Sequence, residues 1–118
     1  MDKFFTLVTR LGLLFFFSLL SHLSHAAQTY VYVDDMSKLD YQLLGDGNVY
    51  FRNLNVFNSQ VTGCCYAFYL DTKTEYGKSA WSVILMKMAA GGDLYLHVSE
   101  SNPPTSGNPA LVDHLGNW

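Results

Sequence analysis

Alternating apolar and polar positions predict strands along most of the chain after residue 28. In Thr29–Asp34, Tyr30 and Tyr32 alternate with valines, which is the period of two expected for a strand. The same period predicts further strands at 39–44, 48–54, 61–70, 93–99 and 110–115. Gly45-Asp46-Gly47-Asn48 separates the second strand from the third and tolerates the positive φ of tight hairpin loops. We therefore expect those two strands to be antiparallel neighbours.

The segment after the fourth predicted strand changes to a helical period. Its apolar residues recur at i, i+3, i+4 and i+7, at Trp81, Ile84, Leu85 and Met88, which is the stripe of an amphipathic helix. Ser79 is expected to cap the N-terminus. Gly91-Gly92 is expected to end the helix, because glycine readily adopts the left-handed C-cap conformation. The pattern predicts one helix of about three turns.

Glu100–Pro109 carries all three prolines of the chain and no other apolar residue, so it is expected to be an exposed loop. The predicted order is strands, one helix, a strand, this loop and a last short strand. A single helix after a central strand favours a mainly β fold with one α-helix, arranged as a small OB-like Greek-key barrel of five to six strands.

The first 26 residues differ from the rest in composition. Lys3 and Arg10 precede the almost unbroken apolar run Leu11–Leu20, and small residues follow up to Ala27. This is the pattern of a secretory signal peptide, with cleavage expected after Ala26. The apolar run is about ten residues long, whereas a stable membrane-spanning helix needs roughly 20. We expect a secreted or periplasmic protein without an integral membrane segment, in which residues 27–118 form a single OB-like domain.

Charge argues against a nucleic-acid partner. The full chain has a formal net charge of -3, and loss of Asp2, Lys3 and Arg10 with the signal peptide would change it to -4. Nucleic-acid affinity comes largely from clustered basic residues that neutralise phosphates. The remaining basic residues are scattered, at Lys38, Arg52, Lys73, Lys78 and Lys87.

The chain contains few groups with catalytic or metal-binding potential. There is no G-x-S-x-G nucleophile motif, and the carboxylates of Asp34 and Asp35 are neighbours at the end of a strand. His97 is expected to face solvent from mid-strand. A structural zinc site needs about four ligands, and after residue 26 only His97 and His114 accompany the cysteines. We expect no metal, no cofactor and no enzymatic activity.

Cys64 and Cys65 are adjacent, so their side chains would point to opposite faces of a strand. Export would place them in an oxidising compartment. We expect one thiol in the core and the other free, oxidised or paired between subunits. A strained vicinal disulfide that acts as a redox switch is the alternative.

Tyrosine is the strongest remaining signal for binding. All eight tyrosines and both tryptophans follow residue 26. Exposed tyrosine rings stack on flat apolar ligand faces, while their hydroxyl groups stay hydrated. Structural use is the alternative, because tyrosine is a good strand former. The candidate ligand-contacting residues on the predicted strands are Tyr30, Tyr32, Tyr50 and Tyr95.

Two segments resemble a known family. They are C-C-Y-A-F-Y-L-D at 64–71 and G-K-S-A-W-S-V-I-L-M-K-M-A-A-G-G-D-L-Y-L-H-V at 77–98. A cysteine-bearing strand, an amphipathic helix, a glycine stop and an L-x-L-x-V strand are similar to small exported bacterial proteins of the subtilase cytotoxin B-subunit family. The resemblance implies an OB-like fold and, for the toxin members, pentameric assembly and glycan binding at the cell surface. Those members carry a second cysteine near the C-terminus, whereas Leu111–Trp118 contains none.

These observations favour an exported, non-enzymatic binding or assembly module. We expect it to contact a surface glycan or a partner protein through its tyrosines and the Glu100–Pro109 loop, because loops on a rigid scaffold carry recognition. A homo-oligomer would fit this hypothesis. The alternatives are a periplasmic accessory protein that pairs through its sheet edge or helix face, and a thiol redox protein that uses Cys64 and Cys65.

Overall fold

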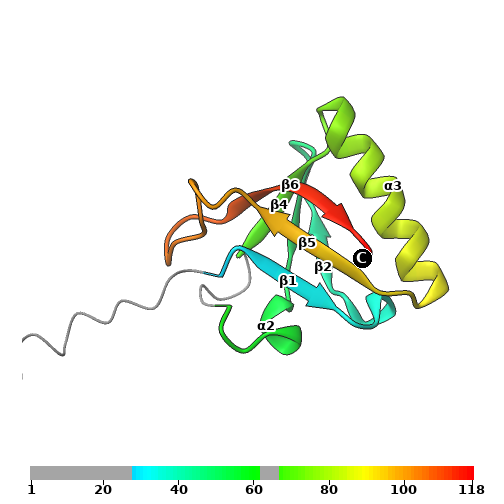
Figure 1. The fold of residues 1–118 in the computed structure, drawn as a ribbon. Coiled ribbons are helices and arrows are strands. Elements are labelled where there is room, and N and C mark those ends of the chain that lie inside the picture. Colours follow the sequence, from blue (N-terminus) through cyan, green and yellow to red (C-terminus); the bar gives the residue numbers. More distant parts are fainter. Residues whose placement is uncertain (1–27, 62–66) are drawn as a thin grey trace, which may run out of the picture.

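The computed structural model describes residues 28–61 and 67–118, and Figure 1 shows a sheet with one main helix at the ends of its strands. In this part of the chain six strands form a mixed sheet in the order β1-β5-β6-β4-β3-β2. The strands are β1 (Tyr30–Val33), β2 (Tyr41–Leu43), β3 (Asn48–Phe51), β4 (Phe68–Asp71), β5 (Leu94–Val98) and β6 (Ala110–Gly116). The helical elements are the 3-10 turn η2 (Met36–Lys38), α2 (Leu54–Phe57) and α3 (Glu75–Ala90). The prediction of a mainly β fold with one main helix is confirmed.

The sheet combines antiparallel pairs with one parallel pair. β4 and β6 are parallel, and the other neighbouring strands are antiparallel. The hairpin of β2 and β3 confirms the pairing that Gly45–Asn48 predicted. β1 and β2 form the two edges of the sheet, although only the short segment around η2 separates them in the sequence. No pairing joins β1 to β2 in the described residues, so the sheet is open.

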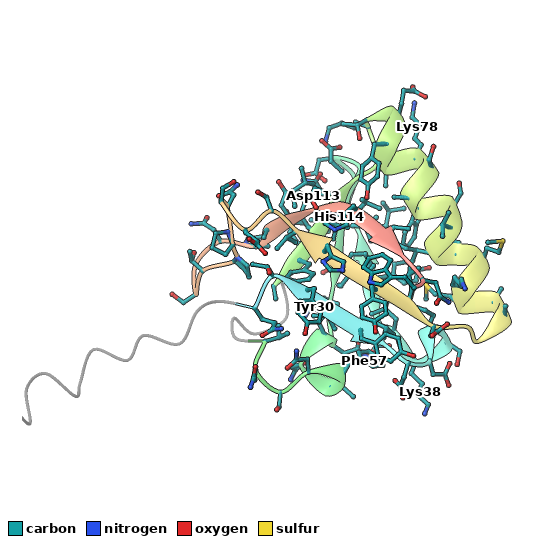
Figure 2. All side chains as sticks on the ribbon, in the orientation of Figure 1. Tyr30, Lys38, Phe57, Lys78, Asp113 and His114 are labelled. Atoms are coloured by element: carbon teal, nitrogen blue, oxygen red, sulfur yellow. The ribbon has the colours of Figure 1, made fainter. Side chains whose placement is uncertain are left out.

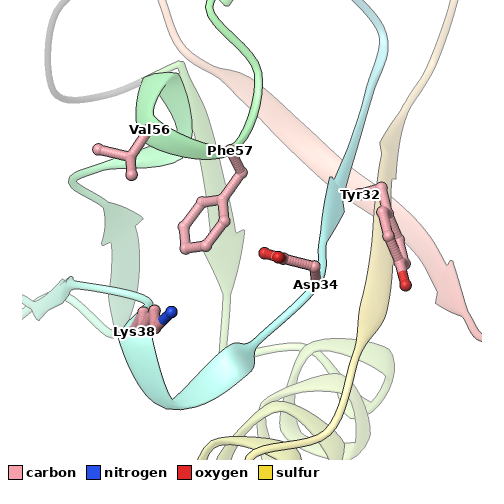
Figure 3. A pocket seen from close by; sticks show the side chains of 5 residues that line it. All are labelled: Tyr32, Asp34, Lys38, Val56 and Phe57. Atoms are coloured by element: carbon pink, nitrogen blue, oxygen red, sulfur yellow. The ribbon is translucent and has the colours of Figure 1, made fainter.

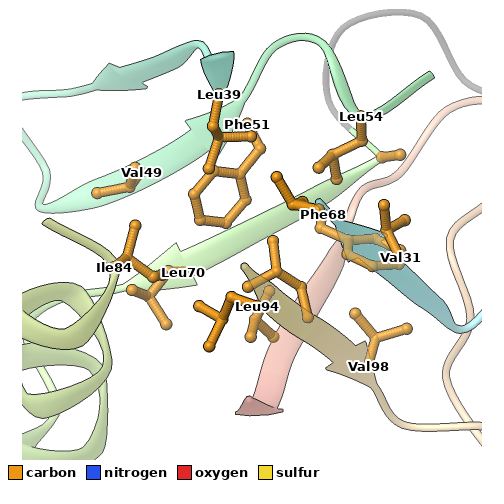
Figure 4. Close-up of a cluster of buried hydrophobic side chains, with 14 of the residues drawn as sticks. Val31, Leu39, Val49, Phe51, Leu54, Phe68, Leu70, Ile84, Leu94 and Val98 are labelled. Carbon is orange, nitrogen blue, oxygen red and sulfur yellow. The ribbon is translucent and has the colours of Figure 1, made fainter. Parts of the chain in front are cut away.

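The core lies on one face of this sheet and beneath α3. Figure 4 shows Val31, Phe68, Leu70 and Leu94 from three strands converging with Ile84 from the helix. All five side chains are fully buried or nearly so. Alternation along the strands accounts for this arrangement, because successive strand residues point to opposite faces. The buried side chains of β1 and β5 alternate with more exposed ones.

The main helix begins earlier than predicted, and three of the four residues of its predicted stripe face the core. Its N-cap is Thr74 rather than Ser79, and the Thr74 hydroxyl accepts a hydrogen bond from the Gly77 N–H at 2.9 Å. The helix has 16 residues and ends as predicted at Gly91, whose φ is 69°. Of the predicted stripe, Ile84 is fully buried and Trp81 and Met88 pack against the core, whereas Leu85 is 41% exposed. Small residues in the first turns bring the helix close to β4, so its most buried side is formed by Gly77, Ala80 and Ile84.

Three further predictions need correction within the described residues. The predicted strand at 39–44 is shorter: Leu39 is buried just after η2, whereas Tyr41 and Leu43 are exposed, so the three do not share a face. The strand at 48–54 ends at Phe51 because the chain turns into α2, an element that the sequence pattern did not predict. The Glu100–Pro109 segment is a loop as predicted, although Pro104 is buried.

Two sets of predictions fall outside the described residues. The signal peptide and its cleavage after Ala26 lie in residues 1–27, and Cys64 and Cys65 lie in residues 62–66. The central strand predicted at 61–70 is described only in its last part, where β4 begins at Phe68.

Gly77 provides a sharp test of how α3 packs. A Cβ atom at this position would overlap the Asp71 carbonyl oxygen and lie 2.9 Å from the Thr74 hydroxyl oxygen. Helix propensity favours alanine over glycine by about 1 kcal/mol, but overpacking a tight contact costs about 1–3 kcal/mol. We expect Gly77→Ala to lower the free energy of unfolding in urea denaturation.

Gly45 supplies the matched control, because no atom lies within 4 Å of a Cβ built there. Gly45→Ala should change the free energy of unfolding by no more than about 0.5 kcal/mol. A Gly77→Ala protein that is as stable as the wild type would show that α3 does not pack against Asp71 in this way.

Candidate functional site

The outer face of β1, β5 and β6 carries a continuous set of rings, which we call the ring surface. Its members are Tyr30, Tyr32, Tyr95, His97, His114 and Trp118. The register of the β1–β5 pair places Tyr30 opposite His97 and Tyr32 opposite Tyr95. The residues between them point inward and are buried. The same alternation that fills the core therefore brings these rings together outside it.

The rings lie within stacking distance of one another. Tyr32 and Tyr95 have centroids 4.5 Å apart, and Tyr30 and His97 are stacked at 5.4 Å. Trp118 stacks on Tyr95 and on His97, at 5.1 Å in each case. Aromatic pairs in this distance range contribute about 0.5–1.5 kcal/mol beyond the area that they bury. The ring surface is thus an ordered platform rather than a scatter of exposed side chains.

An irregularity in β6 brings His114 onto this face. His97 pairs with His114, but the next pair is Val98 with Val112, which leaves Asp113 without a partner in the register. A bulge of this kind re-aims the residues beside it. His114 therefore stacks on His97 at 4.3 Å, and its Nδ1 lies 2.6 Å from the Asp113 carboxylate. Figure 2 shows Asp113 and His114 on the opposite side of β5 from Tyr30.

Asp93 forms a polar end to the ring surface. Its carboxylate accepts a hydrogen bond from the Tyr32 hydroxyl at 2.8 Å and another from the Asn117 side-chain amide at 2.7 Å. The bond from Tyr32 is the main cause that lowers the pKa of Asp93, and the same bond raises the pKa of Tyr32. A charged carboxylate and a protonated phenol thus lie beside the rings at neutral pH.

His97 lies on the outward face of β5 as predicted, but it is only partly exposed because neighbouring rings stack against it. Its Nε2 atom is buried and finds no hydrogen-bond partner among the described residues. Burial lowers the pKa of His97, the positive charge of His114 lowers it further, and Asp113 opposes both effects. Because the ordinary value is 6.5, His97 is mainly neutral at pH 7.

A groove of about 470 Å³ lies next to Tyr32, between β1, η2 and α2. Tyr32, Asp34, Lys38, Val56 and Phe57 line it, and Figure 3 shows Asp34 and Phe57 pointing toward one another across it. The groove combines a carboxylate and an ammonium group with apolar walls. Such a mixture suits ligands that have both hydroxyl groups and C–H faces.

Three of the four predicted tyrosines come together. Tyr30, Tyr32 and Tyr95 belong to the ring surface, whereas Tyr50 stacks on Tyr69 at 5.7 Å on β3 and β4. The sequence interpretation did not include His97, His114 and Trp118 in the binding surface. Its period-two pattern did place His97 on the outward face with Tyr95, which was a usable signal. No sequence signal indicated Trp118, because it follows the last predicted strand.

Other kinds of site receive no structural support in the described residues. Residues 28–61 and 67–118 contain no group of three or more His, Cys, Asp or Glu that could hold a metal ion. Among these residues no helix is both long and apolar enough to cross a membrane. The thiol hypothesis stays a prediction, because Cys64 and Cys65 lie outside the described segments.

Searches of protein-family models, curated proteins and solved structures find no match to this chain.

The partly buried His97 ring should make stability depend on pH. A histidine whose pKa is lowered by folding binds protons more readily in the unfolded chain. Its contribution to stability is therefore complete above about pH 6.5 and is lost as the pH falls through the folded pKa. We expect the wild type to lose more unfolding free energy than His97→Phe between pH 7 and pH 5, as measured by urea denaturation.

The Phe variant keeps a ring in the stack and removes only the titration, so the difference between the two proteins isolates His97 from the carboxylates. Equal pH dependence in both proteins, or an NMR titration midpoint for His97 above 6.5, would contradict the partial burial of this ring.

Proposed function

We propose that this sheet is the open form of an OB-like barrel. An OB fold is a five-stranded, partly open Greek-key barrel in which the first strand reaches both edges of the sheet. Here β1 and β2 occupy the two edges and follow one another closely in the chain. Reading them as one first strand that η2 interrupts gives five strands, with α3 between the third and fourth. The parallel β4–β6 pair supports this reading.

We further propose that the protein is an exported, non-enzymatic binding module that contacts a surface glycan. The observation that carries the proposal is the ring surface, in which Tyr30, Tyr32, Tyr95 and Trp118 share one outward face. Rings offer flat apolar faces on which the C–H faces of sugars stack. The family resemblance at 64–71 and 77–98 points in the same direction, and the apolar run at Leu11–Leu20 supports export.

Polar groups beside the rings support a glycan over a purely apolar ligand. Asp93 and the Tyr32 hydroxyl lie at one end of the ring surface. Asp34 and Lys38 line the groove next to Tyr32. Binding sites typically combine apolar walls with a few placed polar groups that fix orientation. A sugar provides both kinds of partner, since its hydroxyl groups surround apolar C–H faces.

A glycan array probed with the mature chain, residues 27–118, tests this proposal. We expect binding to one class of glycan, and Tyr30→Ala should weaken it about two- to tenfold, because one stacked ring contributes about 0.5–1.5 kcal/mol.

Tyr50→Ala is the matched control, since it removes the same atoms from a tyrosine that stacks on Tyr69 outside the ring surface. Its affinity should equal that of the wild type. An array without any bound glycan, or equal losses in both variants, would count against the proposal.

A second candidate function, assembly with identical or partner subunits, is favoured by the β2 edge. β2 ends the sheet, and its Leu43 is 54% exposed beside Leu44 at 37%. Tyr41 connects this edge to the helix through an edge-to-face contact with Trp81, with centroids 4.9 Å apart. Edge strands expose unpaired backbone groups and readily pair with other chains.

Native mass spectrometry of the mature chain, with and without reductant, tests assembly. If the β2 edge assembles, the mass is a multiple of the monomer that resists reductant, and Leu43→Lys converts it to a monomer. A wild-type monomer would refute self-assembly and leave the accessory role with a different partner protein. An oligomer that dissociates on reduction would instead indicate a bridge through Cys64 or Cys65.

A further inference from the structure

The indole ring of Trp118 packs so closely against Gly116 that only glycine leaves room for it. A Cβ atom built at Gly116 would overlap ring carbon Cζ3 of Trp118 and lie 2.7 Å from Cε3. The indole therefore lies directly over the backbone at Gly116. The glycine is needed for this close approach, since any side chain would force the indole to move.

The indole presents one face to the protein and the other to solvent. Its ring plane is within 13° of that of Tyr95 and within 27° of that of His97, so its inner face is covered. Nevertheless 70% of the residue is exposed. A large apolar side chain that is ordered on one side and open on the other is a ready stacking platform.

Hydrogen bonds hold the adjoining chain in place and add polar groups next to the platform. Asn117 donates to Asp93, and Tyr32 donates to the other oxygen of the same carboxylate. A carboxylate has about four acceptor positions, so Asp93 can accept further hydrogen bonds from a ligand. The lowered pKa of Asp93 keeps it ionised at neutral pH.

We propose that Trp118 is the ring on which the ligand stacks, and that the ligand class is a pyranoside with one C–H face, such as the galactose ring of lactose, whose hydroxyl groups bond to Asp93. This inference rests on the proposed glycan-binding function and deepens it. Gly116 positions the indole, and Asn117 fixes the backbone before it. A sugar fits better than a planar aromatic ligand, because the platform ends at a charged acceptor rather than at another apolar wall.

Fluorine NMR of the mature chain labelled with 5-fluorotryptophan tests the inference, because the described residues contain two indoles that serve as probe and internal control. Trp81 lies on α3 against Tyr41, and a Trp118→Phe variant assigns the two signals. Lactose should shift the Trp118 signal in a saturable way and leave Trp81 unchanged. Mannitol, an open-chain polyol without a ring face, should shift neither signal.

Gly116→Ala tests the packing of Trp118 against Gly116 without removing any ring. The indole is an exposed side-chain end that can turn away, so the fold should persist. We expect this variant to weaken lactose binding about two- to tenfold, the loss expected from displacing one stacked ring, and Asp93→Asn to weaken it as well. Gly45→Ala, whose added methyl group meets no atom within 4 Å, should bind as tightly as the wild type.

The outcomes separate this inference from the proposed function. If the array identifies a bound glycan and neither lactose nor that glycan shifts the Trp118 signal, the inference is wrong and the binding function stands. An array without bound glycans together with an unshifted Trp118 signal would overturn both. Unchanged lactose affinity in Gly116→Ala would show that Gly116 does not position the Trp118 ring for binding.

Discussion

Strand alternation between β1 and β5 is the constraint on which the rest of the structure depends. Burying Val31 and Val33 against the side chains of β5 fixes the register of this pair. A slip of one residue would place the rings in the core and the aliphatic side chains in water. The ring surface is therefore specified by the hydrophobic core beneath it. The pairing of β1 with β5 thus determines both the packing of the core and the arrangement of the candidate site.

Two local departures from regular structure complete that site. The unmatched Asp113 in β6 brings His114 beside His97, and Gly116 lets the chain place Trp118 over Tyr95. Each departure costs some regular pairing or backbone entropy, and each adds a ring to the outer face. Such irregularities at the end of a strand are where a fold can gain function without disturbing its core.

The sequence predicted much of the fold, because its signals are local. Strand alternation is visible within a few residues in β1, β3 and β5. The hairpin is likewise indicated by the glycines between β2 and β3. The start of α3 was placed too late, since its first turn is defined by the contact of Gly77 with Asp71 rather than by an apolar stripe. The short α2 was missed because four residues are fewer than one clear helical repeat.

The sequence alone determined that Tyr30 and Tyr32 would share one face of their strand opposite the valines, and that Tyr95 would lie opposite the Leu94 and Leu96 face. It could not determine which outward faces adjoin, because strand order depends on contacts between distant parts of the chain. Pairing β5 with both β1 and β6 gathered three of the tyrosines with His97 and Trp118, and left Tyr50 with Tyr69. Alternation sets the direction of a side chain, but only tertiary packing selects its neighbours.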